Sequence, residues 1–275
     1  MRAVNPACYI LGMSLLVTDA IVLHAFDYLE SSRIIRLLTR DAGVQSVLAR
    51  GARKSRGRYG SALDIFAEGA AQLYVKPNRE LHNLSSFELT RARSELAFDI
   101  GRFTAAAAIA ELALRFGGEE ANPLLYDTVA DSLDRLTQSS PLTTVEDGLA
   151  GCWRIISVLG FTPELSSCSL CHTPLRESDD AAFSHAAGGI VCPSCSRLAP
   201  AGRRIPASAR TAIRTWLEPE IVGAVADSST PSTALAENEG RSHQRLLREF
   251  IGAHVGDDRP LRAFAVWEHD RWSAA

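Results

Sequence analysis

Hydrophobic and polar positions change their pattern near residue 92. Up to that point, short runs rich in branched residues alternate with turn sequences such as "DAG", "GRYG" and "KPN". In one run, Val44, Ser46 and Leu48 share a face opposite Gln45, Val47 and Ala49. A sandwich usually needs about seven strands, so fewer strands favour a small β-barrel. The predicted strands cover 19–26, 33–40, 43–51, 63–75 and 81–90.

The pattern after residue 92 is helical. Residues 93–118 are rich in alanine and end in two glycines, and Asn122 followed by Pro123 is typical of a helix start. Apolar residues three or four apart predict one buried face on each helix. For the first helix we expect Leu96, Ile100, Phe103, Ala107, Ala110 and Leu114; for the second, Leu125, Val129, Leu133 and Leu136.

Three further helices follow the same rule. Thr144 and Asp147 have the spacing of a capping box before a stripe that ends at Gly160 and Pro163. Residues 208–218 and 241–255 return to a helical pattern on either side of a polar connection at 227–240. The stripes contain Leu149, Cys152, Trp153, Ile156 and Leu159, and then Leu246, Leu247, Phe250, Ile251 and Val255.

Between these helices, residues 166–198 read as a loop that carries two CxxC pairs. Cys168 and Cys171 form the first pair, and Cys192 and Cys195 form the second. Two such turns complete a tetrahedral Zn²⁺ site, and four thiolates leave no position for water, which predicts one structural zinc per chain. A vestigial site or an opportunistic disulfide is the alternative. His172 and His185 are nearby substitute ligands or solvated loop residues, Cys152 is expected in the core, and Cys8 is expected to be an exposed thiol.

Composition adds a charge asymmetry. The chain has 275 residues and a net charge of −3, but residues 1–92 carry 12 Lys/Arg against 8 Asp/Glu, or +4. Residues 93–275 carry 17 against 24, or −7, so a polyanion would be expected to bind the N-terminal part. No apolar run reaches the length of a membrane span. Residues 8–17 resemble a short signal-peptide core, but a disordered extension over 1–16, or a start at Met13, fits them better.

The sequence "RGARKSRGRYG" at 50–60 concentrates positive charge. A linker, a targeting signal and a contact for phosphates are its three interpretations. Predicted strands on both sides favour a basic loop that binds nucleic acid through counterion release. Its candidate residues are Arg50, Arg53, Lys54, Arg56 and Arg58. Arg33, Arg36 and Arg40 extend this patch or are scattered surface charges, and Tyr28, Tyr59 and Tyr74 stack on bases or simply pack.

The sequence contains no nucleophile elbow, HExxH, Walker loop, GxGxxG or H-x-E motif. Paired acids such as Glu119–Glu120 and Asp257–Asp258 stand beside turn residues and are interpreted as solvated. We therefore expect a protein that is not an enzyme. An RNA-binding zinc-ribbon module remains an alternative function, and a zinc hydrolase is a third.

Several segments resemble the bacterial RecO family of DNA repair and recombination mediators. They are the run from "DAIVLHAF" to "GARKSRGR", "FELT" at 87–90, "LGFTPELSSCSLC" with "GGIVCPSC", and "GDDRPLRAF" at 256–264. The resemblance covers about residues 17–265. It implies an α+β multidomain protein: an OB-fold barrel at 17–92, then a mainly α-helical domain at 93–165 and 199–275 that carries a zinc ribbon at 166–198.

The resemblance also implies a function in the RecF pathway. Members of the family bind single- and double-stranded DNA, anneal complementary strands, and with RecR assist RecA loading onto DNA coated with single-strand-binding protein, whose C-terminal tail they contact. A cytoplasmic, nucleoid-associated protein of bacteria is expected on the same ground. The zinc prediction rests on the cysteines themselves, because some relatives lack them.

Overall fold

The computed structural model describes residues 14–53, 59–198, 202–218, 235–254 and 259–268. It divides the chain into two compact units, which are described one at a time. The first contains Met1–Asp99 and Ala110–Thr137, and the second contains Ile100–Ile109 and Gln138–Ala275. None of the described helices is long and apolar enough to cross a membrane.

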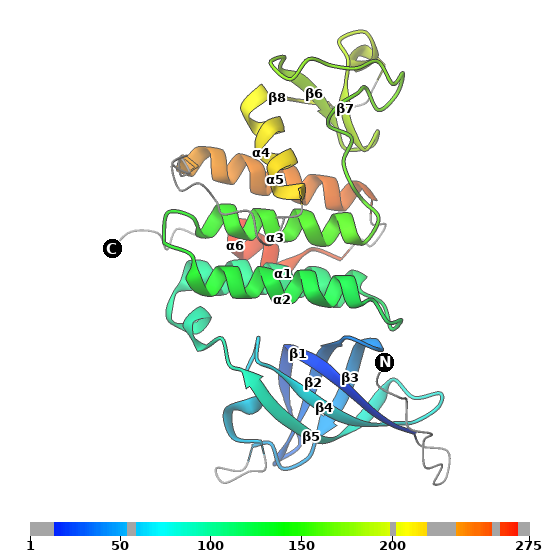
Figure 1. Cartoon of the computed structure of the whole chain (residues 1–275), viewed down its shortest axis with the longest axis vertical. Coiled ribbons are helices and arrows are strands. Elements are labelled where there is room, and N and C mark those ends of the chain that lie inside the picture. The colour runs from blue at the N-terminus through cyan, green and yellow to red at the C-terminus, as the bar shows by residue number, and fades with distance from the viewer. Residues whose placement is uncertain (1–13, 54–58, 199–201, 219–234, 255–258, 269–275) are drawn as a thin grey trace. The chain divides into compact units, whose positions relative to one another are not determined.

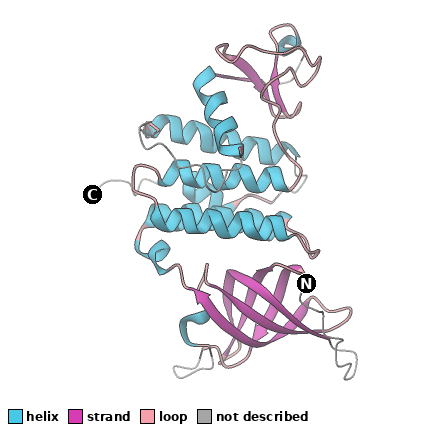
Figure 2. Cartoon of the chain, in the orientation of Figure 1, coloured by secondary structure: helices cyan, strands magenta, loops and turns pink. Residues whose placement is uncertain are grey.

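The first unit is built on a five-stranded barrel (Figures 1 and 2). Its strands are β1 (Ser14–Tyr28), β2 (Ser32–Thr39), β3 (Gly43–Ala49), β4 (Glu68–Val75) and β5 (Leu81–Arg91). They close in the order β1-β2-β3-β5-β4, with β3 and β5 parallel and every other pair antiparallel. Alternate residues point inward, so Ile35, Leu37, Val47 and Leu73 fill the interior without exposure. The OB-like barrel predicted from the sequence is confirmed.

Two ends of the barrel differ from the expectation. Strand β1 begins at Ser14, and Leu15 is opposite Tyr74 of β4, so residues 14–16 belong to the barrel rather than to an extension. Residues 1–13, including Cys8 and Met13, lie outside the described part of the chain. Residues 63–67 were predicted as strand, but Gly60–Leu63 form a 3₁₀ helix, η1, and β4 starts only at Glu68.

The helices largely follow the predicted ranges. A 3₁₀ helix, η2 (Ser94–Phe98), precedes α1 (Ile100–Phe116), α2 (Pro123–Gln138) and α3 (Thr144–Val158). Then follow α4 (Ala207–Leu217), α5 (Glu237–His254) and α6 (Arg262–Glu268), the last of which the sequence pattern did not predict. The predicted stripes of α2 and α5 are buried, apart from Val255, which lies outside the described residues. In α3 the stripe is buried from Leu149 to Ile156, and Leu159 is partly exposed.

The buried face predicted for the first helix is confirmed only at Leu96 and Ala110. Ile100 is half exposed and Ala107 is partly exposed. The helix is apolar around much of its circumference, so spacing alone does not select one face, and the packing partners decide it. The buried apolar residues of α1 are Ala105, Ala106, Ala108, Ile109, Ala110, Leu112 and Ala113.

Two predicted caps have opposite outcomes. Asn122 Oδ1 accepts a hydrogen bond from the Leu125 backbone N–H at 3.0 Å, which confirms the cap of α2. The prediction of a capping box at α3 is wrong, because the N-cap residue is Thr143 rather than Thr144, and the Thr143 side chain makes no capping hydrogen bond. Asp147 instead accepts a bond from Ser139 Oγ at 2.6 Å, so the carboxylate holds the connection before the helix.

The cysteine segment is more regular than the predicted loop. It contains β6 (Ala181–Ser184), β7 (Gly189–Val191) and the 3₁₀ helix η3 (Cys195–Arg197). The strands β6 and β7 form an antiparallel sheet with β8 (Arg203–Ile205), in the order β7-β6-β8. Each strand has only three or four residues, too few for sequence periodicity to detect. Strand β8 lies beyond residue 198, where the sequence analysis ended the zinc ribbon. The domain limits set from the sequence remain a prediction.

A buried arginine connects the barrel to α2 inside the first unit. The Arg93 side chain is fully buried. Its Nε donates to Asp134 Oδ1 at 2.6 Å, its Nη1 donates to the Phe66 carbonyl at 3.0 Å, and its Nη2 bonds Glu68. The other oxygen of Glu68 accepts from the Tyr126 hydroxyl at 3.1 Å. One guanidinium thus satisfies groups from β4, the loop before it and α2.

Candidate metal centre and nucleic-acid interface

The four predicted metal ligands lie together in the second unit. The sulfurs of Cys168, Cys171, Cys192 and Cys195 are all within 4.8 Å of one another, and Cys171 Sγ is 3.8 Å from Cys192 Sγ. A tetrahedral Zn²⁺ with Zn–S bonds of about 2.3 Å places its sulfurs about 3.8 Å apart. The cluster therefore has the size and the donor set of a four-cysteine zinc site.

Backbone geometry holds the sulfurs in this arrangement. The Cys192 N–H donates to Cys168 Sγ at 3.3 Å, and the Cys195 N–H donates to Cys192 Sγ at 3.4 Å. His172 takes a left-handed conformation with φ +59°, which turns the chain sharply after Cys171. Such N–H···S bonds stabilise thiolates and orient metal ligands.

The ionisation of the cluster also favours a cation. Burial opposes ionisation of Cys168, but backbone N–H groups of Cys192, Cys171 and Leu170 outweigh it and lower the pKa of its thiol to about 6. Contacts with the sulfurs of Cys192 and Cys171 raise the pKa of the Cys195 thiol to about 12. Four thiolates this close repel one another, so a divalent cation is what would let them ionise together.

Four sulfur ligands would give the metal a closed shell. A catalytic zinc keeps one position for water or substrate, whereas a four-cysteine site keeps none. The residues fit a structural Zn²⁺ that joins the turn after Cys168 to the end of β7. This arrangement argues against the zinc hydrolase alternative.

Neither nearby histidine belongs to the cluster. His172 is exposed beside it, and His185 Nε2 is 3.1 Å from Glu249 Oε2 on α5. Burial lowers the pKa of His185 despite that carboxylate. Glu249 also accepts hydrogen bonds from Arg203 Nη2 at 2.9 Å and from Arg245 Nε at 2.9 Å. The Glu249 carboxylate therefore links β8 and the β6–β7 turn to α5. Cys152 is fully buried within α3, as predicted, and burial raises the pKa of its thiol.

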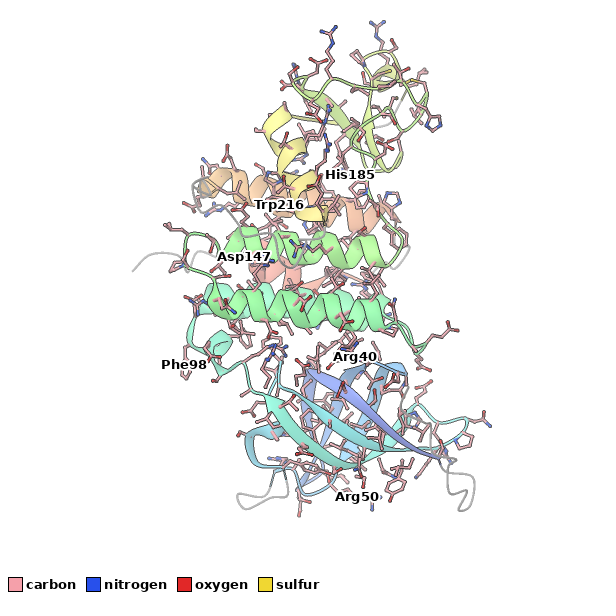
Figure 3. The ribbon with its side chains drawn as sticks, in the orientation of Figure 1. Arg40, Arg50, Phe98, Asp147, His185 and Trp216 are labelled. Carbon is pink, nitrogen blue, oxygen red and sulfur yellow. The ribbon has the colours of Figure 1, made fainter. Side chains whose placement is uncertain are left out.

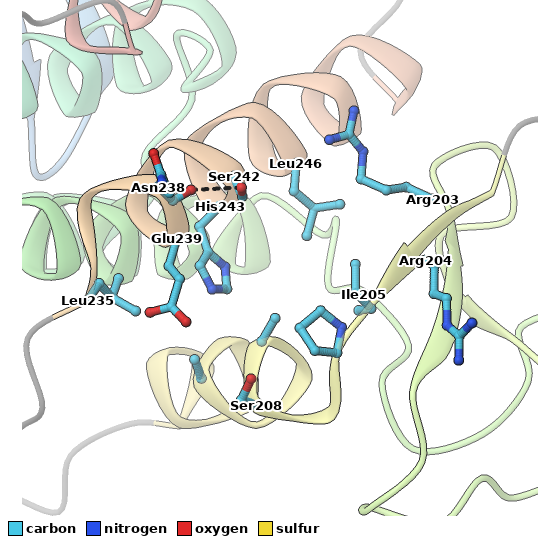
Figure 4. A pocket seen from close by; sticks show the side chains of 13 residues that line it. Arg203, Arg204, Ile205, Ser208, Leu235, Asn238, Glu239, Ser242, His243 and Leu246 are labelled. Atoms are coloured by element: carbon cyan, nitrogen blue, oxygen red, sulfur yellow. Dashed lines mark hydrogen bonds between the residues drawn. The ribbon is translucent and has the colours of Figure 1, made fainter.

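A pocket of about 440 Å³ lies among β8, α4 and the start of α5 (Figure 4). Its lining is apolar at Ile205 and Leu246, with Arg203 and Arg204 on the β8 side. The buried His243 ring stacks edge-on against Trp216 at 4.8 Å, and burial lowers the pKa of His243 to about 4. The imidazole is therefore neutral at pH 7. Nothing in the sequence marked this pocket, because its lining comes from three separate segments.

The basic loop is described only in part. Arg50 follows β3, is exposed, and makes no ion pair with the described residues. Arg53 is occupied, since its Nε is 3.3 Å from Asp27 Oδ2 and its Nη1 donates to the Leu29 carbonyl at 3.0 Å. Lys54, Arg56 and Arg58 lie outside the described residues, so their role stays a prediction.

The three neighbouring arginines, Arg33, Arg36 and Arg40, have different surroundings. Arg40 binds Asp127 of α2 at 2.6 Å and stacks over the Tyr126 ring at 4.5 Å, so it joins the barrel to α2. In Figure 3, Arg40 and Arg50 stand at opposite ends of the barrel, as expected for the two ends of an antiparallel hairpin. Arg33 Nε contacts Asp27 at 3.3 Å, and the Nε of Arg36 is buried without a partner among the described residues.

The three candidate tyrosines also differ. Tyr59 is buried in the barrel core, and its hydroxyl donates to the Leu84 carbonyl at 3.0 Å, so its role is packing. Tyr28 and Tyr74 are both exposed, with 40% and 42% of their surface accessible. They lie on β1 and β4, respectively, and both are available to a ligand.

Comparisons with known proteins agree over most of the chain. A family model described as "Recombination protein O N terminal" matches residues 13–93, and one described as "Recombination protein O C terminal" matches residues 97–263. A protein from Anaeromyxobacter sp. (strain K), "DNA repair protein RecO", is 32% identical over 249 residues, which are 89% of this chain and 93% of that protein. A protein of the same name from Gloeobacter violaceus is 31% identical over 240 residues, 87% of each chain.

Proposed function

Because the chain belongs to the RecO family, with a role in DNA repair and recombination, we propose that it is a mediator that binds single- and double-stranded DNA and anneals complementary strands. With RecR it assists the loading of RecA onto DNA coated with single-strand-binding protein, and it contacts the C-terminal tail of that protein. The zinc module serves this role structurally. No chemical step on DNA is part of the proposal.

The basic loop after β3 is the observation that carries DNA binding in this proposal. Its first residue, Arg50, is exposed and unpaired among the described residues, and the sequence adds Lys54, Arg56 and Arg58 within the next eight positions. Cations of this kind bind phosphates of any sequence and release the counterions condensed on DNA. Annealing follows from the same physics, because screening two backbones while leaving the base edges free lets complementary strands pair.

Replacing Arg53, Lys54 and Arg56 together by alanine should weaken binding to single strands and duplexes of any sequence. Each phosphate contact that is lost should flatten the plot of log affinity against log salt by about one unit. The measurement is a salt titration of fluorescence anisotropy with labelled oligonucleotides. Arg197, Arg204 and Arg241 of the second unit, changed together to alanine, give a control that loses the same charge.

An unchanged affinity and slope in the loop variant would rule out the loop as the main DNA contact. A chain that binds RNA of the same length much more tightly than DNA would instead favour the RNA-binding alternative. Capture of RecR by the immobilised chain tests membership of the pathway independently of the loop.

A further inference from the structure

The four cysteines of the metal cluster differ in how far solvent reaches them. Cys168 is fully buried, Cys192 and Cys195 are partly exposed, and Cys171 is exposed. The residues on either side of Cys171 in the chain are exposed as well. A dissolved reagent therefore reaches Cys171 more easily than it reaches any other member of the cluster.

Metal ligation would prepare this sulfur for oxidation. A cysteine binds Zn²⁺ as a thiolate, and the thiolate rather than the thiol is the form that attacks a peroxide. Burial protects a structural cysteine from such attack, but Cys171 has no such cover. The hydroxyl oxygen of Thr173 is 3.3 Å from Cys171 Sγ, so this hydroxyl can donate a hydrogen bond to a peroxide oxygen that approaches the sulfur.

A second sulfur lies where it can complete the reaction. Cys171 Sγ is 3.8 Å from Cys192 Sγ, which belongs to the other CxxC turn. The two sulfurs need to approach by about 1.8 Å to reach the length of a disulfide bond. Cys192 is partly exposed, so a hydroxide ion that leaves during this step can pass into water. The sulfur of Cys168, in contrast, lies in the interior and accepts the Cys192 N–H.

We infer that Cys171 is an oxidation site through which hydroperoxides open the zinc module, with Cys192 as its partner in a reversible disulfide. In the first step, the Cys171 thiolate attacks one oxygen of hydrogen peroxide. The S–O bond forms, the O–O bond breaks, and hydroxide leaves. In the second step, the Cys192 thiolate attacks the sulfur of the resulting sulfenic acid, so that the S–S bond forms, the S–O bond breaks and a second hydroxide leaves. The two sulfurs together lose two electrons, which the peroxide gains.

The disulfide removes the closed shell of ligands that the cluster offers a metal. Only Cys168 and Cys195 remain as thiolates, too few for a structural Zn²⁺. The segment between α3 and α4 then loses the folding free energy that the metal supplies. The barrel has no cysteine among its described residues, so this chemistry does not act on that part of it. A thiol reductant reverses the disulfide, which makes the modification reversible once Zn²⁺ is present again.

The test treats the zinc-loaded full chain with hydrogen peroxide beside a chromogenic zinc chelator. One Zn²⁺ should be released for each disulfide formed, and peptide mapping without reductant should join the peptides that contain Cys171 and Cys192. Dithiothreitol with added Zn²⁺ should restore the zinc content. A disulfide between Cys168 and Cys171, or disulfide formation without release of zinc, would overturn the inference, as would a chain that peroxide leaves unchanged.

Exchanges of cysteine for histidine provide matched variants, because histidine beside three cysteines is an established zinc ligand set. Cys171→His should lose the rapid release of zinc, whereas Cys195→His should keep both the release and the disulfide. Cys192→His lacks the partner and should accumulate a sulfenic acid that dimedone traps on Cys171. Equal rates of release from Cys171→His and Cys195→His would contradict the assignment. The mapping on the unaltered chain needs no variant and decides the pairing independently.

Discussion

Replacing Cys168 by alanine is expected to release the metal and unfold the segment between α3 and α4. Cys168 is fully buried, and its sulfur accepts the Cys192 N–H in addition to serving as a ligand. Structural zinc sites supply folding free energy directly, with apparent binding free energies of about 10–16 kcal/mol in small zinc modules. The purified chain should contain about one zinc, and the Cys168→Ala chain should contain none.

Cys152→Ala is the matched control, because it makes the same change at another fully buried cysteine that is outside the cluster. It should keep the zinc and lose only packing. Limited proteolysis reads out the fold: cleavage should appear between residues 166 and 198 in Cys168→Ala and after chelation of the unaltered chain. A Cys168→Ala chain that retains full zinc would contradict the four-cysteine site, as would a zinc-free native chain with four reactive thiols and no new cleavage.

Replacing Arg93 by alanine is expected to destabilise the first unit by up to about 3–5 kcal/mol, because it removes a fully buried cation and leaves the partly buried carboxylates of Glu68 and Asp134 without it. The guanidinium pairs with Glu68 and Asp134. Burial raises the pKa of the Tyr126 hydroxyl, and the neighbouring Glu68 carboxylate raises it further. Burial lowers the pKa of Arg93 itself, but its charge persists at pH 7 because arginine titrates far above that range. Urea denaturation followed by circular dichroism measures the loss.

Arg91 provides a control on the same carboxylate. It also pairs with Asp134, but 54% of its side chain is exposed, so Arg91→Ala should cost less than about 1 kcal/mol. Arg93 has a φ of +52°, and an Arg93→Gly variant removes the guanidinium while relieving that backbone strain. Arg93→Gly should still lose most of the stability. If it were as stable as the unaltered chain, strain rather than charge would explain the effect.

The sequence was most informative where side-chain chemistry is local. Two CxxC turns fix the approximate position of four sulfurs whatever the surrounding fold, so the cluster was predicted residue by residue. Asn122 before Pro123 located the start of α2, and the alternation along β3 separated its two sets of side chains without assigning either to the core. These features depend on neighbours a few positions away.

Features that depend on distant segments could not be predicted. α1 is apolar on several sides, and only its packing partners choose Ala105 and Ile109 over Ile100. The strands β6–β8 are too short for a periodic signal, and their pairing joins segments that are separate in the sequence. Arg93 reads as one more surface charge in "RAR", yet Glu68 and Asp134, 25 and 41 positions away, make it a buried anchor.

Annealing of complementary strands coated with single-strand-binding protein tests the central claim most directly. The zinc-loaded chain should accelerate annealing without nucleotide hydrolysis, RecR should bind the chain, and the Arg53, Lys54 and Arg56 triple alanine variant should anneal more slowly. Annealing no faster than the spontaneous rate, by a folded and zinc-loaded chain, would contradict the assignment of this protein as a DNA-annealing mediator.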